Sequence, residues 1–222
     1  MLSVLNPIFE RYERLCAELD QLFERVYHDF PACVSCKPAC SDCCHAMFDL
    51  PLIEALYLNR AFNAQMGFGP ERSAVIDAAG EADRKSTRIK RELYRQSKEL
   101  APEEIMQEAA RIRLRCPLLN SDERCHLYDW RPVTCRLYGI PASIGGVAHV
   151  CGKSAFDKGQ AYPTLALDKI QDRLAAMSQE AAQVLGSRFK ELHLVYVPVS
   201  MALLTHYDAE YLGIGPAKQE KT

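Results

Sequence analysis

The ten cysteines of this 222-residue chain constrain its fold more than any other feature, because nine of them gather in two stretches. Five lie within twelve positions and four follow far downstream, in the order Cys33, Cys36, Cys40, Cys43, Cys44, Cys116, Cys125, Cys135 and Cys151. The N-terminus has no basic segment followed by an apolar run, so no signal peptide is expected and a cytoplasmic location is predicted. In that reducing compartment, clustered cysteines indicate metal ligands or reactive thiols rather than disulfides.

The composition favours one soluble, packed domain over residues 1–222. Hydrophobic residues make up 48% of the chain, which predicts a core rather than disorder. The formal net charge of −2 argues against nucleic acid or an anionic membrane as a partner. No window reaches the ~18 consecutive apolar residues of a membrane helix. A metal ion or cluster is the expected partner, and nothing in the sequence indicates a protein partner.

Residues 6–30 predict an amphipathic helix, because apolar residues recur there at helical spacing. Asn6 is the predicted N-cap, and Pro7 suits the first turn. Cys16 falls on the apolar stripe, so we expect it to be a small core residue rather than a ligand.

Further helices are predicted at 50–65, with Asp49 as its cap, and at 71–100, 102–112 and 164–185. The predicted helix at 71–100 carries a basic run from Arg84 to Arg95. We interpret this run as a solvated face rather than a site for an acidic partner. Residues 193–199 alternate like an edge strand, and the last residues should fray. The predicted fold is mainly α: a helical frame, with a C-terminal helical region at 164–214, and two cysteine-rich loops with a small β-hairpin around a metal site at 33–151.

The first cysteine loop has the spacing of metal-binding loops. Thiolates two or three residues apart can turn back on one centre, as in zinc sites and iron–sulfur clusters. Adjacent side chains usually diverge, so we expect only one of Cys43 and Cys44 to bind the main centre. Cys36, Cys40 and Cys43 also spell C-x3-C-x2-C, a radical-SAM spacing, but the alternating βα units of that barrel are missing.

The second cysteine region is rich in turn residues. Asn120 to Asp122 predict a hairpin turn, with Cys116 and Cys125 at its two bases. Four thiolates around a [4Fe–4S]2+ core leave a charge near −2, which is costly to bury. Arg131 and Arg136 are therefore candidates for charge compensation or N–H···S donation, with exposed surface arginines as the alternative.

Other side chains near the cysteines are lesser candidates. His45, His126 and His149 each lie beside or close to a cysteine and offer a nitrogen ligand, although enough thiols exist without them. Tyr128 and Trp130 are expected to shield the site from water.

Together these motifs resemble a known family. The run Cys36…Cys40…Cys43-Cys44, followed by Cys116-Pro-Leu-Leu, Cys125-His-Leu-Tyr and Arg131-Pro-Val-Thr-Cys135-Arg136, resembles the YkgJ-type cysteine-cluster family over roughly residues 33–151. That family is described as a zinc- or iron-chelating domain with a CxxCxxCC signature. The run is also similar to the cysteine-cluster part of flagellin lysine N-methylases. The family spacing is C-x2-C-x2-CC, so either Cys33 or Cys36 fills its first position.

Three functions follow from these observations. The favoured one is a metal-binding protein without catalysis of its own, holding an iron–sulfur cluster, preferably [4Fe–4S], with zinc as the alternative. The second is a methylase-like enzyme that uses the cluster with SAM, although no glycine-rich SAM loop is visible. The third is a thiol redox or metal-trafficking protein that uses Cys43 and Cys44.

Overall fold

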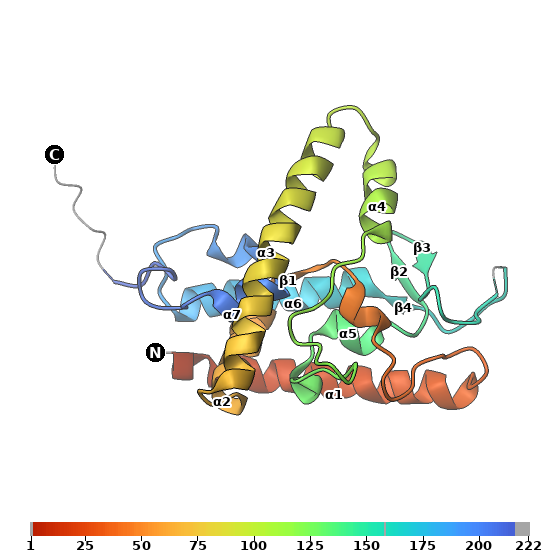
Figure 1. The fold of residues 1–222 in the computed structure, drawn as a ribbon, viewed down its shortest axis with the longest axis horizontal. Helices are drawn as coiled ribbons and strands as arrows, with labels where there is room; N and C mark the ends of the chain where they lie inside the picture. Colours follow the sequence, from red (N-terminus) through yellow and green to blue (C-terminus); the bar gives the residue numbers. More distant parts are fainter. Residues whose placement is uncertain (1, 158, 216–222) are drawn as a thin grey trace.

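Helices make up most of the computed structural model, which describes residues 2–157 and 159–215 (Figure 1). The predicted mainly α frame with two cysteine-bearing loops is confirmed. The residues expected to fray at the C-terminus lie, from 216 on, outside the described part of the chain. The helices are α1 (Asn6–Asp29), α2 (Leu52–Gln65), α3 (Pro70–Gln96), α4 (Pro102–Arg111), α5 (Val133–Leu137), α6 (Leu167–Val184) and α7 (Val199–Leu204).

Two small sheets join distant parts of the chain. Strand β1 (Asp49–Pro51) pairs antiparallel with β5 (Tyr196–Pro198), which confirms a strand within the predicted range 193–199. The strand is shorter than predicted, because Leu192–Leu194 form a 3-10 turn and α7 begins at Val199. In the other sheet, β2 (Ala142–Ile144) lies between an antiparallel β3 (Val147–His149) and a parallel β4 (Leu165–Ala166). The turn between β2 and β3 is Gly145-Gly146, and both glycines have positive φ.

Helix α1 presents its predicted apolar stripe to the core. Cys16 is only 4% exposed on that stripe, which confirms it as a core residue. The predicted cap was wrong: Asn6 is the first helical residue, after a 3-10 turn at Leu2–Leu5, and its side chain accepts a hydrogen bond from Arg60 instead. Pro7 lies in the first turn, as expected.

Helix α2 is buried on nearly all sides, because α6 and α7 both pack against it. It begins at Leu52, two residues later than predicted, and Asp49 is not its cap. Asp49 instead lies in β1 and forms an ion pair with Lys90 of α3 at 2.6 Å. The rigid proline at position 51 starts the helix without a side-chain cap.

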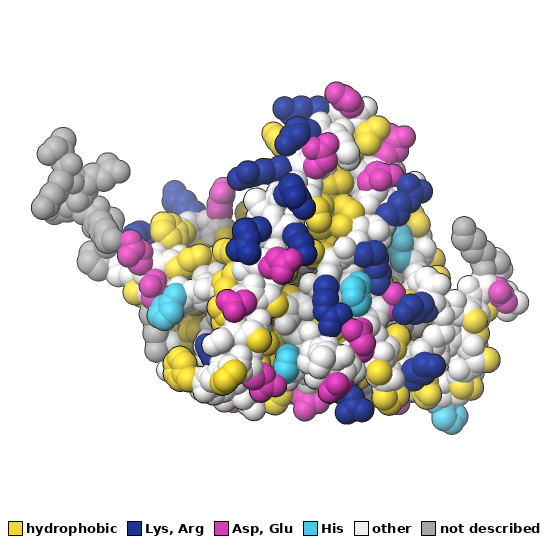
Figure 2. Space-filling view, in the orientation of Figure 1, with side chains coloured by type: hydrophobic (Ala, Val, Ile, Leu, Met, Phe, Trp, Pro, Cys, Tyr) yellow, Lys and Arg dark blue, Asp and Glu magenta, His cyan; other side chains and the backbone are white. Residues whose placement is uncertain are grey.

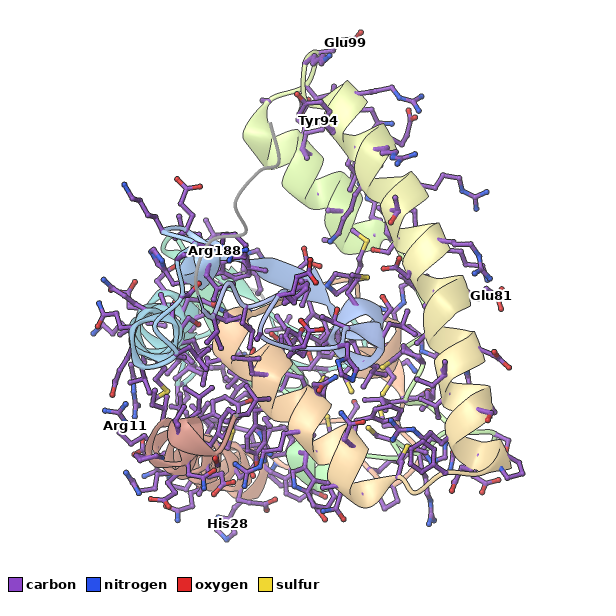
Figure 3. The ribbon with its side chains drawn as sticks, turned by 90° about the vertical axis from the view of Figure 1, so that its left-hand side faces the viewer. Arg11, His28, Glu81, Tyr94, Glu99 and Arg188 are labelled. Atoms are coloured by element: carbon purple, nitrogen blue, oxygen red, sulfur yellow. The ribbon has the colours of Figure 1, made fainter. Side chains whose placement is uncertain are left out.

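Helices α3 and α4 form an arm that projects from the rest of the molecule, with Tyr94 and Glu99 near its tip (Figures 1 and 3). Basic side chains cover the visible face of the arm, with acidic ones among them (Figure 2). Lys85 pairs with Glu81, and Arg95 with Glu92, along the helix. No helix in the described ranges is both long and apolar enough to cross a membrane.

Candidate metal centre

Backbone hydrogen bonds bring the two cysteine regions together although they lie far apart in the sequence. The amide of Cys116 donates to the carbonyl of Cys44 at 2.7 Å, and the amide of Leu114 donates to that of His45 at 2.9 Å. Residues 46 and 113 also form an antiparallel bridge. The chain at 44–46 therefore runs beside the chain at 113–116, which places Cys44 next to Cys116.

The predicted hairpin turn carries Cys125. The Asn120 side chain accepts hydrogen bonds from the amides of Asp122 and Arg124 at 3.0 and 2.9 Å, which closes the turn. Leu119 and Cys125 form an antiparallel bridge. The next turn residue, Glu123, has a positive φ of 56° and accepts hydrogen bonds from Arg115 and from Ser41 of the first loop. The hairpin is thus fastened to the first cysteine loop.

Short helix α5 carries Cys135 and is held from two sides. Buried Glu54 of α2 accepts the amide of Val133 at 2.8 Å and the hydroxyl of Tyr12 at 2.7 Å. On the other side, Arg136 and Asp20 of α1 form an ion pair. Burial raises the pKa of Glu54 above its ordinary value. These contacts explain how a five-residue helix can place one sulfur in a fixed position.

All three segments open on one cavity of about 770 Å3. Eight of the nine clustered cysteines line it, namely Cys36, Cys40, Cys43, Cys44, Cys116, Cys125, Cys135 and Cys151. Cys33 is not among the described lining residues, and neither is any histidine. Eight of the predicted residues thus border one cavity, and Cys36 rather than Cys33 is among them.

Five of these thiols shift one another's pKa values through their charges and hydrogen bonds. We call these five the inner group: Cys43, Cys44, Cys116, Cys125 and Cys135. The sulfurs of Cys43 and Cys44 are 4.0 Å apart. A hydrogen bond from the Cys44 thiol lowers the pKa of Cys43 to about 7 and raises that of Cys44. Burial raises the pKa of Cys135 well above its usual value, and the charges of Cys43, Cys116 and Cys125 raise it further. Adjacent Cys43 and Cys44 thus both face the inner group, contrary to the expected divergence.

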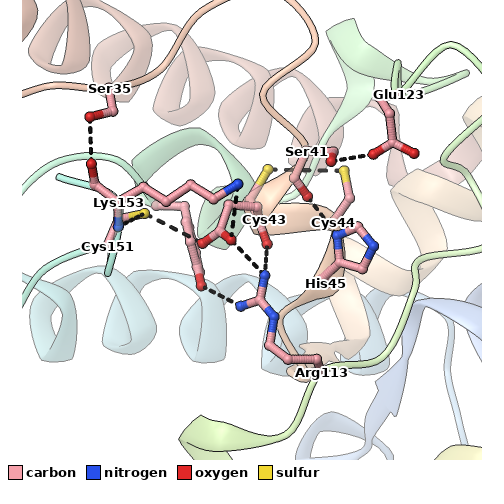
Figure 4. A network of polar contacts seen from close by, with 11 residues as sticks. Ser35, Ser41, Cys43, Cys44, His45, Arg113, Glu123, Cys151 and Lys153 are labelled. Carbon is pink, nitrogen blue, oxygen red and sulfur yellow. Dashed lines mark hydrogen bonds and ion pairs between the residues drawn. The ribbon is translucent and has the colours of Figure 1, made fainter.

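The remaining three lining thiols, Cys36, Cys40 and Cys151, form an outer group. Burial raises the pKa of Cys36 to about 11, and the charges of Cys40, Cys151 and, from the inner group, Cys43 act in the same direction. The Cys151 thiol donates to a carboxylate oxygen of Asp42 at 3.5 Å. Figure 4 shows this contact beside the Cys43–Cys44 pair.

Backbone amides point at three of the sulfurs with one repeated local pattern. The amide of Lys153 donates to the sulfur of Cys151 at 3.4 Å. The amides of Leu118 and Leu127 lower the pKa of Cys116 and Cys125 by the same kind of bond, although burial raises both more strongly. In each case the donor lies two residues after the cysteine. N–H···S bonds of this kind stabilise thiolates, which are the form that binds metal.

The donor set of the cavity fits a thiolate-ligated metal. The buried hydroxyl of Ser86, which also lines the cavity, has no hydrogen-bond partner in the described structure, and a bound group would supply one. Within residues 2–157 and 159–215, no three Cys, His, Asp or Glu side chains are arranged to hold one ion as they stand. Loading the cavity with a single ion therefore requires some side chains to rotate.

The two candidate arginines line the cavity from its α5 side. Arg136 is 6% exposed and donates to the carbonyls of Arg131 and Asp129 as well as to Asp20. Arg131 donates to Asp20 at 3.1 Å, and its charge lowers the pKa of Cys43 and Cys125. Neither points outward as a free surface arginine.

The other candidate side chains lie elsewhere. Tyr128 lines the cavity but is 60% exposed and stacks on Arg131, while Trp130 packs against the core and is not a described lining residue. The expected aromatic shield is therefore wrong for Trp130, whereas Tyr128 borders the cavity. His45 contacts the carbonyl of Ser41, His126 contacts Glu71, and His149 is exposed in β3.

A comparison with protein-family models matches residues 35–152, more than half of the chain, to the family described as "CxxCxxCC: Putative zinc- or iron-chelating domain". The chain belongs to this family. The matched range of the CxxCxxCC family contains the eight cavity-lining cysteines and begins after Cys33. No curated protein and no solved structure matches the chain.

Sequence reasoning missed four residues that shape the site. Asp42 was overlooked because an acidic residue inside a cysteine loop has no periodic signal. Asp20 and Glu54 looked like ordinary helix residues, although Glu54 interrupts an apolar run and could have drawn notice. Gly139 leaves room for the sulfur of Cys36, because a Cβ there would lie 2.2 Å from it.

Proposed function

We propose that this member of the CxxCxxCC family holds an iron–sulfur cluster, most simply one [4Fe–4S], through thiols of the inner group. One observation carries the proposal: five half-buried thiols from two regions of the chain line one cavity. A [4Fe–4S] cluster is held by four cysteine thiolates, and the inner group offers that number from two regions of the chain. The cavity of about 770 Å3 is also much larger than one ion requires.

The proposed ligands are Cys44, Cys116, Cys125 and Cys135, with Cys43 beside them. Cys116 and Cys125 each receive an amide hydrogen bond, and Cys135 is fixed by α5. The ionised thiols carry negative charge into a partly buried site, so positive charge is needed close by. Arg131 and Arg136 supply it, and their bonds to Asp20 and to backbone carbonyls hold both side chains in place.

The role that fits this arrangement is structural support, sensing or electron transfer. When bound, the cluster supplies one-electron redox chemistry. The protein contributes the ligands, the amide bonds that tune them and a partial screen from water.

Anaerobically prepared full-length protein tests the proposal. It should be brown, contain iron and acid-labile sulfide, and lose absorbance near ~400 nm on reduction. Cys135→Ser should lose this absorbance, whereas the matched control Cys33→Ser should keep it, because Cys33 does not line the cavity. A colourless protein with stoichiometric zinc and no sulfide would refute the cluster.

A thiol redox function is the second candidate, and the Cys43–Cys44 pair favours it. The two sulfurs are 4.0 Å apart and the pKa of Cys43 is lowered to about 7, which is typical of reactive thiols. Thiol counts before and after mild oxidation test it. A disulfide between these two residues that forms and reduces reversibly in cluster-loaded protein would favour this function over the cluster-holding role.

A further inference from the structure

The outer group shares its cavity with the inner group but has its own anchoring. A turn closed by a hydrogen bond from the Cys40 amide to the carbonyl of Lys37, at 2.9 Å, brings Cys36 and Cys40 back toward each other. Within this turn Ala39 has a φ of 65°, a left-handed conformation that is unfavourable for a non-glycine residue. A strained turn persists only where its surroundings hold it, and strain of this kind clusters at functional sites.

Cys151 reaches the same place from more than one hundred residues downstream. The hydroxyl of Ser35 donates to the carbonyl of Lys153, and the amide of Ala155 donates to the carbonyl of Cys33 at 2.9 Å. These two bonds fasten the turn that carries Cys151 to the loop that carries Cys36. Figure 4 shows the bond between Ser35 and Lys153, with Cys151 beside Lys153.

Asp42 completes the group with an oxygen donor. One carboxylate oxygen, Oδ1, is held by Arg113 at 2.7 Å and by Lys153 at 3.6 Å. The other, Oδ2, faces the sulfur of Cys151 at 3.5 Å. With one oxygen anchored by cations and the other turned to a thiol, the carboxylate is oriented as a ligand supported by neighbouring groups would be.

The distance between Asp42 and Cys151 matches a shared metal ion. A tetrahedral zinc or ferrous ion with bonds of about 2.3 Å to sulfur and about 2.0 Å to oxygen separates these two donors by about 3.5 Å. That is the separation in the structure. Rotation of the remaining sulfurs toward this pair would complete four-coordination by three thiolates and one carboxylate.

We propose that Cys36, Cys40, Cys151 and Asp42 form a second metal site, separate from the proposed cluster, for one divalent transition-metal ion. Binding releases the protons of the three thiols, because only thiolates bind metal. Three thiolates and a carboxylate around a divalent ion leave a charge of about −2. Arg113 and Lys153, which already contact Asp42, lie where they offset this charge.

The test uses full-length protein, first loaded with its cluster and then titrated with Co2+, whose thiolate charge-transfer absorbance reports sulfur ligands. Wild type should bind one equivalent. Cys151→Ser and Asp42→Asn should each weaken this binding at least about tenfold, while the iron and sulfide content stays constant. Cys33→Ser is the matched control and should bind Co2+ as wild type does.

Three results would overturn the second site. One is wild-type protein that takes up no Co2+ with thiolate absorbance. Another is a Cys151→Ser variant that binds Co2+ as tightly as Cys33→Ser. The last is a Cys151→Ser variant that loses the cluster, because Cys151 would then belong to it.

The second metal site can be tested even if the protein holds no iron–sulfur cluster. In protein that carries zinc and no sulfide, the second site predicts two zinc ions in wild type and one in Cys151→Ser. Equal zinc content in the two proteins would overturn the second site on its own terms.

Discussion

Replacing Gly139 by alanine should separate metal binding from folding. The new Cβ would lie 2.2 Å from the sulfur of Cys36, whereas ordinary contacts begin at 3.4 Å. The sulfur must therefore retreat by at least about 1.2 Å, and metal–ligand distances tolerate only about 0.2 Å. We expect Gly139→Ala to weaken metal binding at the outer group at least about tenfold.

The fold should tolerate this substitution. Gly139 is not one of the described residues with positive φ, so alanine fits its backbone. The sulfur is the end of a movable side chain, and the next contact, to Phe23 at 3.3 Å, needs only a small adjustment. Gly→Ala also removes freedom from the unfolded chain, which stabilises by about 0.4–1 kcal/mol where no strain arises.

Metal titrations and thermal unfolding of the metal-free protein measure the two effects separately. Gly67→Ala is the matched control, because a Cβ at that position meets nothing within 4 Å. Unchanged metal affinity in Gly139→Ala would show that Cys36 does not need its present place to bind. A large loss of stability in the metal-free variant would show that the backbone, rather than the sulfur, has to move.

Three further predictions concern charge and protonation. Arg136→Ala should lower the free energy of unfolding in urea by about 3 kcal/mol, the low end for a broken buried pair, because Asp20 keeps 38% of its side-chain surface exposed; an effect below about 1 kcal/mol would contradict this. In metal-free protein Cys43 should be alkylated first, with a half-maximal rate near pH 7, since its pKa is lowered to about 7; mass spectrometry that finds another cysteine modified first would refute it. The raised pKa of Glu54 means that its contribution to stability is full below its ordinary pKa and is lost as the pH rises through the folded-state pKa, so Glu54→Gln should flatten the fall in stability above about pH 4.5, and identical pH profiles would argue against a raised pKa.

The sequence determined the elements whose information is local. Helical periodicity predicted α1 and α6 to within a few residues, because an apolar stripe must be buried whatever it packs against. Turn residues predicted the hairpin at Asn120, and the order of the cysteine motifs indicated the family. The predicted helix caps at Asn6 and Asp49 were wrong. These two side chains instead contact Arg60 and Lys90, which lie far away in the sequence.

Only the tertiary structure decided how the cysteines are divided. Spacing along the chain treats Cys33 and Cys36 alike, but only Cys36 reaches the cavity. The inner and outer groups each join residues more than seventy positions apart, and such contacts depend on how the helices pack rather than on local spacing. The contact between Asp42 and Cys151 also depends on helix packing. The residues next to each of them in the sequence do not predict this contact.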